Sequence, residues 1–161
     1  MVDQPVDQTG RIVVGVDGSA GSEAALRWAM AHARQMNASV EAVAAWQYPS
    51  MYGYSWGYLP SMPDGGNFSA SAEKALEEAV ARVQNQAGSA TDVATRVVEG
   101  HPAQVLMEAA RDARLLVVGS RGHGAFAGVL LGSVSQHCVQ HAPCPVLVVP
   151  QRDAVDVPAA G

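Results

Sequence analysis

Glycines gather in one short stretch of the chain, between an apolar run at 115–118 and a segment that can form a helix. Gly119, Gly122, Gly124, Gly128 and Gly132 follow one another before Ser133. Because glycine lets the backbone approach another group closely, such a loop can turn its N–H groups toward an anion. Ser133 and Gln136 have capping-box spacing, so Ser133 is the expected N-cap of the next helix. A helix start favours phosphate, and the stretch therefore predicts a phosphate-binding loop; a flexible surface loop is the alternative.

Three common phosphate-binding patterns do not fit this stretch. A P-loop needs a lysine after its last glycine, and the single lysine of the chain, Lys74, lies elsewhere. The dinucleotide fingerprint occurs as GHGAFA at 122–127, but no acidic residue follows before Asp153. A ribose-binding acid would be expected about twenty residues after the fingerprint. A phospho-acceptor domain would need an acidic pair after the first strand and a lysine near the last, and the sequence has neither.

Strand and helix patterns alternate along the rest of the chain. The sequence predicts buried strands at 11–17, 39–46, 115–118 and 146–149, and an edge strand at 92–99. It predicts helices at 22–36 with Ser22 as the cap, at 69–87, at 102–113, and from Ser133 to just before Pro143. This order predicts an α/β fold, a doubly wound, three-layer, Rossmann-like sheet of five parallel strands with about four helices. Ligands of such sheets bind beyond the carboxyl ends of the strands.

Composition excludes several classes of protein. The chain has 161 residues, of which 48% are apolar and 16% charged, as expected for one ordinary domain. Its net charge of −5 argues against a nucleic-acid partner. No apolar run approaches the roughly 20 residues that span a membrane, and no secretory signal begins the chain. With only two cysteines, the expected location is the cytoplasm, and the domain is expected at 11–150 between tails at 1–10 and 151–161.

Five blocks of the sequence resemble the ATP-binding universal stress proteins. These blocks are VVGVDGS at 13–19, VVEGHPAQVL at 97–106, LLVVGSRGHG at 115–124, LLGSVS at 130–135 and APCPVLVVP at 142–150. The nucleotide signature of that family, Gly-x2-Gly-x9-Gly-Ser, matches Gly119, Gly122, Gly132 and Ser133. The resemblance covers most of the chain, and it implies a fold of the adenine nucleotide alpha hydrolase-like kind.

The resemblance also implies roles for the matching residues. Asp17, with Gly18 and Ser19 beside it, would contact the ribose or adenine side of the nucleotide, and Ala45 would pair with adenine through its backbone. The residues expected around the phosphates are Gly119, Ser120, Arg121, Gly122, His123, Gly124, Gly132, Ser133, Val134 and Ser135. The expected ligand is ATP, with or without Mg²⁺. A cap on the following helix is the alternative role for Asp17.

Two other groups of residues are candidates for a chemical role. His137, Cys138, His141 and Cys144 suggest zinc, but Cys138 would point about 100° away from His137 on a helix, so buried cysteines and surface histidines are expected. The segment 47–68 is rich in Gly, Pro, Ser and Tyr, and it either covers the pocket or stays solvent-exposed. No metal site is predicted. No catalytic residue is predicted either, because no base accompanies His123 or Arg121 to position water.

Assembly and function follow from these expectations. Pro145 and Pro150 frame the apolar strand 146–149, whose open edge predicts a homodimer through Val146–Val149. The resemblance likewise implies a dimer. The expected protein is an ATP-binding universal stress protein that senses or buffers adenine nucleotide in a stress response, with an unidentified downstream partner and no contact with nucleic acid or membrane. The alternatives are a nucleotide-free interaction protein, a cyclic AMP binder and a slow ATPase.

Overall fold

The computed structural model describes residues 10–47, 68–88, 91–122 and 131–150. The strands are β1 (Gly10–Gly15), β2 (Ala38–Trp46), β3 (Val93–Glu99), β4 (Leu115–Gly119) and β5 (Val146–Val149). The helices are α1 (Ala20–His32), α2 (Phe68–Ala87), α3 (Pro102–Ala109) and α4 (Ser133–His141). Strands and helices therefore alternate as the sequence predicts. None of the helices in these ranges is long and apolar enough to cross a membrane.

The five strands form one parallel sheet in the order β3-β2-β1-β4-β5, which confirms the predicted fold class. From β1 the chain winds outward through β2 to β3, and it then returns to the other side of β1 for β4 and β5. The strand order reverses between β1 and β4, so their carboxyl ends flank the topological switch point, where open α/β sheets bind ligands. The edge position predicted for β3 is also confirmed.

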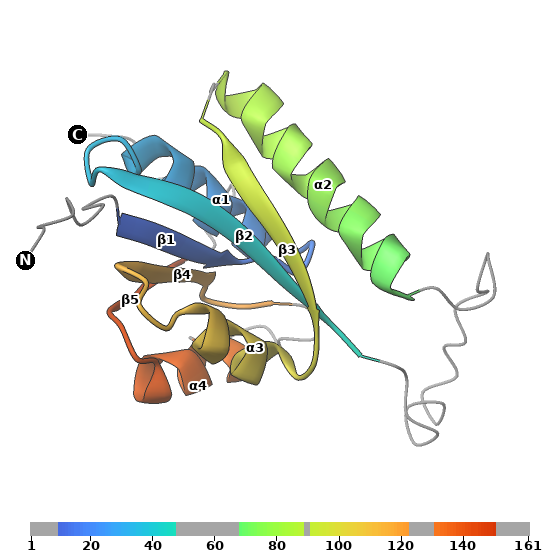
Figure 1. Ribbon diagram of the computed structural model, residues 1–161, viewed down its shortest axis with the longest axis vertical. Helices are drawn as coiled ribbons and strands as arrows, with labels where there is room; N and C mark the ends of the chain where they lie inside the picture. Colours follow the sequence, from blue (N-terminus) through green and yellow to red (C-terminus); the bar gives the residue numbers. More distant parts are fainter. Residues whose placement is uncertain (1–9, 48–67, 89–90, 123–130, 151–161) are drawn as a thin grey trace, which may run out of the picture.

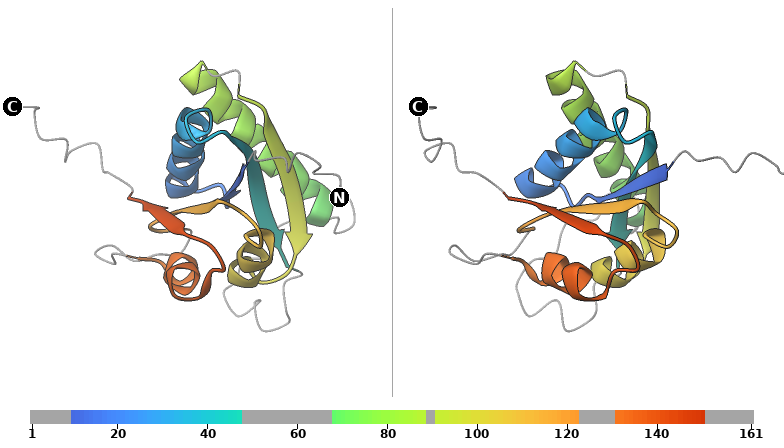
Figure 2. Two further views of the ribbon diagram at one scale, coloured as in Figure 1. Left: turned by 60° about the vertical axis from the view of Figure 1, so that its left-hand side comes forward. Right: turned by 90° about the vertical axis from the view of Figure 1, so that its left-hand side faces the viewer.

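Helices cover both faces of the sheet, as Figures 1 and 2 show. The side chains of Ile12 and Val14 pack with α1 and α2 in one core, and Val13 packs with α3 and α4 in the other. All three side chains are fully buried. Successive residues of a strand point to opposite faces, so a central strand covered on both sides needs an unbroken apolar run. This is why the sequence of β1 does not alternate between apolar and polar residues.

Two predicted helix caps are wrong. The N-cap of α1 is Ser19, not Ser22: the hydroxyl oxygen of Ser19 accepts a hydrogen bond from the N–H of Ser22 at 3.2 Å. The N-cap of α4 is Gly132, without a side-chain cap bond, and Ser133 is the first helical residue. The reason is that the N–H of Gly132 donates to the carbonyl of Ser120 at 2.6 Å, which fixes the backbone one residue earlier than the capping-box spacing predicts.

Element ends differ from the predicted ones by a few residues. β1 starts at Gly10, inside the predicted N-terminal tail, and ends at Gly15, so Asp17 lies just beyond the strand. α3 ends at Ala109 rather than near Ala113, and Asp112 then takes a left-handed conformation with φ of 60°. α1 ends at His32, four residues before the predicted end at residue 36, and the chain then turns through Asn37, which has φ of 49°. The carboxyl ends of the other four strands lie within one residue of their predicted positions, whereas that of β1 lies two residues earlier.

Candidate functional site

A pocket of about 520 Å³ lies at the carboxyl ends of β1, β2 and β4. Its volume falls within the range of roughly 300–1,000 Å³ that is typical of small-molecule sites. The lining residues are Gly15, Val16 and Asp17 after β1; Ser19 and Ser22 at the start of α1; Val43 and Ala45 of β2; Pro102 and Leu106 of α3; Val118, Gly119, Arg121 and Gly122 along and after β4; and Leu131, Gly132, Ser133, Val134 and Ser135 at the start of α4.

Most of the predicted site residues meet in this pocket. Those that line it are Asp17, Ser19, Ala45, Gly119, Arg121, Gly122, Gly132, Ser133, Val134 and Ser135. Gly18 and Ser120 do not: Gly18 has φ of 82° and forms the turn before α1, and Ser120 is 7% exposed. His123 and Gly124 lie outside the described residues, as does nearly all of the aromatic segment predicted as a possible cover.

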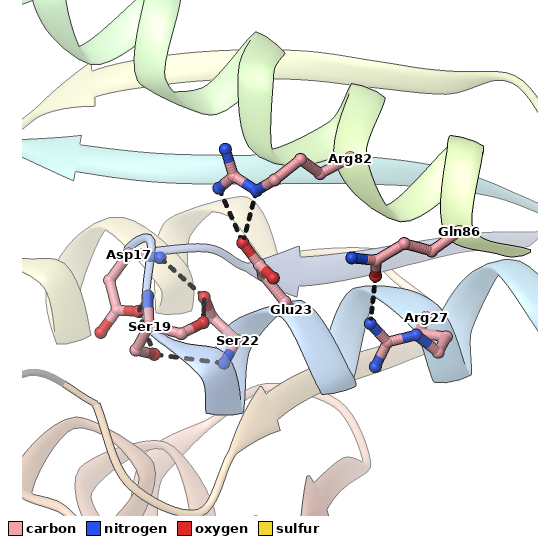
Figure 3. Close-up of polar contacts among 7 residues, drawn as sticks. All are labelled: Asp17, Ser19, Ser22, Glu23, Arg27, Arg82 and Gln86. Atoms are coloured by element: carbon pink, nitrogen blue, oxygen red, sulfur yellow. Dashed lines mark hydrogen bonds and ion pairs between the residues drawn. The ribbon is translucent and has the colours of Figure 1, made fainter.

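Hydrogen bonds hold the Asp17 carboxylate in a tight turn at the start of α1 (Figure 3). Its Oδ1 accepts from the N–H of Ser19 at 2.9 Å and from the Ser19 hydroxyl at 2.5 Å. The N–H of Asp17 donates to Ser22 Oγ at 3.3 Å, and the Ser22 hydroxyl donates to the carbonyl of Ser19 at 3.0 Å. We call Asp17, Ser19 and Ser22 the Asp17 turn. Its carboxylate orders the turn, while the capping of α1 falls to Ser19.

Gly122 faces the other carboxylate oxygen of Asp17. A Cβ atom built on Gly122 would lie 2.5 Å from Asp17 Oδ2, closer than real Cβ contacts come. The loop after β4 therefore passes so close to the Asp17 turn that a side chain at residue 122 would push the carboxylate aside. This close approach is a physical reason for glycine at the second position of the motif.

Gly119 has a different reason to be glycine. A Cβ atom there would lie 2.7 Å from the carbonyl carbon and oxygen of Gly21, in the first turn of α1. Backbone atoms cannot move away as a flexible side chain can, so the end of β4 approaches the start of α1 this closely only because residue 119 is glycine. The family resemblance of the sequence implies a phosphate-binding role for Gly119, and the structure adds a packing role.

Hydrogen bonds also tie together the two ends of the glycine-rich loop. The carbonyl of Ser120 accepts from the N–H of Gly132 at 2.6 Å and from the hydroxyl of Ser135 at 3.0 Å. The N–H of Ser120 donates to the carbonyl of Val149 at 2.9 Å, which fixes this point to β5. The hydroxyl of Ser135 thus has a structural partner, and its side chain is 3% exposed. Any part that Ser135 plays in ligand binding falls to its N–H group.

The start of α4 provides donors for an anion. The first α-helical hydrogen bond runs from the N–H of Gln136 to the carbonyl of Gly132 at 2.9 Å. The N–H groups of Ser133, Val134 and Ser135 precede it and belong to the unsatisfied first turn of the helix. These N–H groups give positive character to the α4 side of the pocket, which Arg121 also lines, whereas Asp17 brings a carboxylate. Such a pocket suits a ligand that carries both an anionic group and hydroxyl donors.

The apolar wall of the pocket escaped the sequence analysis. Val43, Pro102, Leu106 and Val118 line it, and the sequence predicts them only as strand or helix residues. Gly15 belongs to the same wall, because a Cβ atom there would lie 2.7 Å from Leu106 Cδ1. The signal that could have found them is position: Val43 and Val118 lie near the carboxyl ends of strands that flank the switch point.

The cysteine and histidine residues near the C-terminus do not form a metal site. In the described ranges of the chain, no group of three or more His, Cys, Asp or Glu side chains is placed to hold a metal ion. Cys138 is fully buried in the core beneath α3 and α4, as predicted, whereas Cys144 is only partly buried. Burial, and secondarily the nearby Cys144, raise the pKa of the Cys138 thiol to about 11, so this thiol stays protonated at neutral pH. His137 and His141 are exposed, with ring centroids 4.7 Å apart.

Fold and pocket define a doubly wound α/β domain with a ligand site at its topological switch point. Over residues 8–150 the chain matches the universal stress protein family, and it belongs to that family. The five sequence blocks are thereby confirmed as blocks of a universal stress protein family member.

Curated relatives include two proteins of Mycobacterium tuberculosis. Universal stress protein Rv2005c is 36% identical over 151 residues, which cover 89% of this chain and 49% of that protein. Universal stress protein Rv2623 is 35% identical over 150 residues, which cover 89% of this chain and 46% of that protein. The chain thus spans about half the length of these curated relatives.

Two solved structures share the fold over nearly their whole length. A universal stress protein crystallised in complex with cAMP is 33% identical, with a TM-score of 0.61, and the match covers 88% of this chain and 97% of that one. An Arabidopsis thaliana protein of the family, crystallised with AMP bound, is 18% identical with a TM-score of 0.56, and the match covers 94% of this chain and 98% of that one. The second likeness concerns the fold alone.

Proposed function

We propose that this chain binds an adenine nucleotide, with ATP as the first candidate, and that it acts in the cytoplasm as a sensor or buffer of that nucleotide during stress. One observation carries the proposal: the pocket at the switch point joins the Asp17 carboxylate, the glycine motif, an apolar wall and the start of α4. A nucleotide offers a matching set of groups, namely ribose hydroxyls, phosphates and an apolar base. The family membership and the cAMP complex of a relative that is 33% identical support the same ligand class.

Each part of the pocket has a proposed task. Asp17 accepts hydrogen bonds from the ribose, and the backbone of Ala45 pairs with the adenine edge beside the apolar wall. The phosphates lie against the N–H groups of the glycine motif and of the α4 start, with Arg121 as the neighbouring cation. His123 and Gly124 complete the phosphate site in this proposal. Mg²⁺ would accompany the phosphates of ATP and needs no dedicated protein carboxylate.

Cyclic AMP is the second candidate ligand, because a universal stress protein that is 33% identical was crystallised with it. ATP offers three phosphate groups to the N–H donors at the start of α4, whereas cyclic AMP offers a single phosphate that is bonded back to its ribose. Binding to the α4 start therefore favours ATP over cyclic AMP. In either case we propose binding without efficient hydrolysis, since no residue has been assigned as a base that activates water.

Calorimetric titration of the nucleotide-free protein with ATP, AMP and cyclic AMP tests this function. We expect ATP to bind with a dissociation constant of about 1 µM. The Asp17→Asn variant keeps an oxygen that can accept from Ser19 but loses the charge, and we expect about tenfold weaker ATP binding, the size of one charge-assisted hydrogen bond. Absence of binding for all three nucleotides would favour the nucleotide-free alternative. Sustained phosphate release from ATP would favour the alternative that the protein is an ATPase.

The edge strand β5 supports a proposed homodimer. β5 lies at the edge of the sheet, and its four residues are only partly buried. On the β4 side, the carbonyl oxygens of Pro145 and Val149 accept hydrogen bonds from the N–H groups of Leu116 and Ser120. Peptide groups alternate in direction along a strand, so the N–H and C=O groups of Val146 and Val148 face the open edge. Such an edge is a template for pairing with a second copy of the chain.

Multi-angle light scattering at micromolar concentration tests the dimer. We expect a mass about twice the 16.7 kDa of the chain. The Val148→Pro variant removes an N–H group that faces the open edge, and proline is tolerated at such edge positions, so we expect a folded monomer. A circular dichroism spectrum like that of the parent protein would verify the fold. A parent protein that elutes as a monomer would contradict the proposal.

A further inference from the structure

Two polar contacts join α1 and α2, which pack on the same face of the sheet (Figure 3). In the first, Nε and Nη2 of Arg82 both donate to Glu23 Oε1, at 3.1 and 2.7 Å. In the second, Nη2 of Arg27 donates to Gln86 Oε1 at 2.8 Å. Glu23 and Arg27 are one helical turn apart on α1, as are Arg82 and Gln86 on α2, so the two contacts follow each other along the helix pair.

The first of these contacts adjoins the pocket. Glu23 lies in the first turn of α1, and its N–H donates to the carbonyl of Ser19, the N-cap, at 3.1 Å. Its chain neighbour Ser22 lines the pocket and accepts from the N–H of Asp17. The Arg27–Gln86 contact is one turn further along and bonds to no residue of this turn. We therefore expect a change at the Glu23 side chain to affect the geometry of the Asp17 turn more than a change at the Arg27 side chain does.

We propose that Arg82 is a positioning residue of the nucleotide site: through Glu23 it holds the first turn of α1, and with it the Asp17 turn, in the geometry that receives the ribose. The inference rests on the proposed function. Burial favours the contact, because the Glu23 side chain is only 18% exposed while the Arg82 side chain is 50% exposed. Coupling of this kind is reciprocal, so a bound nucleotide strengthens the Arg82–Glu23 contact as much as that contact strengthens nucleotide binding.

A double-mutant cycle on ATP affinity tests the proposal, with Arg27→Met as the matched control. Arg82→Met keeps the aliphatic stem and removes the donors, and we expect roughly two- to fivefold weaker ATP binding, the usual range for a partly exposed ion pair. We expect Glu23→Ala to weaken binding similarly, and the double variant to be no weaker than the weaker single one. Arg82→Lys, which retains the charge, is expected to restore part of the affinity. Arg27→Met makes the same chemical change one turn away and should leave affinity unchanged.

Amide hydrogen exchange on the nucleotide-free protein separates this inference from the function itself. We expect Arg82→Met, but not Arg27→Met, to reduce the protection of the N–H groups of Ser22 and Glu23. If ATP fails to bind the parent protein, the proposed function fails, and the exchange result alone decides whether Arg82 holds the turn. Equal affinity losses in Arg82→Met and Arg27→Met, or unchanged exchange at Ser22 and Glu23 in Arg82→Met, would overturn the proposal.

Discussion

Replacement of Gly119 by alanine is expected to destabilise the domain by about 3 kcal/mol, at the upper end of what overpacking usually costs. The added Cβ would lie 2.7 Å from the carbonyl carbon and oxygen of Gly21. Relief of this clash requires the end of β4 and the first turn of α1 to separate. That separation loosens the contact between a central strand and the helix that covers it. Equilibrium urea denaturation, followed by circular dichroism, measures the change in the free energy of unfolding.

Gly132→Ala is the control for this substitution. It places the same methyl group in the same pocket, but the nearest atom, Arg121 Cα, is 3.5 Å away, which is ordinary contact. Alanine is a poorer N-cap than glycine, and we therefore expect a loss of about 1 kcal/mol or less. Similar decreases in the free energy of unfolding for the two variants would show that the close approach of Gly119 to Gly21 does not determine the stability of the domain.

Replacement of Gly122 by valine is expected to weaken ATP binding by more than about a hundredfold, equivalent to roughly 2.7 kcal/mol. The first added carbon would lie 2.5 Å from Asp17 Oδ2, so the carboxylate must turn away from its place in the pocket. The valine methyl groups also enter space that we assign to the nucleotide. Gly122 contacts the tip of a side chain rather than a backbone, and the cost to folding should therefore be much smaller than for Gly119. Calorimetry and urea denaturation on the same preparation distinguish the two effects.

Ala75→Val serves as the control for Gly122→Val. Ala75 is exposed on α2, outside the pocket, and the substitution adds a branched side chain there. We expect a small loss of helix stability and unchanged ATP affinity. If Gly122→Val binds ATP as tightly as Ala75→Val does, the nucleotide does not occupy the space between Gly122 and Asp17.

Much of the fold could be predicted because its signals are local. The uninterrupted run from Ile12 to Val14 indicates a strand covered on both faces, and the structure divides these residues between two cores. The choice of cap was harder, because Ser19 and Ser22 are both good N-caps by type. Asp17 decides between them: its carboxylate holds Ser19, while the hydroxyl of Ser22 meets the N–H of Asp17. Such competition between side chains depends on geometry that propensities do not contain.

The candidate site could be predicted only where its residues form a motif. Glycine spacing pointed to Gly119, Gly122 and Gly132, which the structure brings into one pocket with Asp17. The apolar wall could not be found in this way, because it arises from packing between distant segments. Leu106 reaches the pocket only because Gly15, far away in the sequence, leaves room for it. A side chain of that kind is identified by its neighbours in space, and the linear sequence does not contain them.

The hydrogen bond between Ser120 and Gly132 has a consequence for the thermodynamics of ligand binding. An untethered loop has to bring its two ends together when it closes around a ligand, and that loss of chain entropy reduces affinity. Here the carbonyl of Ser120 already holds the N–H of Gly132 at 2.6 Å and the hydroxyl of Ser135 at 3.0 Å. The entropy cost of bringing the two ends of the loop together therefore falls on the folding of the domain. A ligand that contacts both ends does not lose binding free energy to that cost.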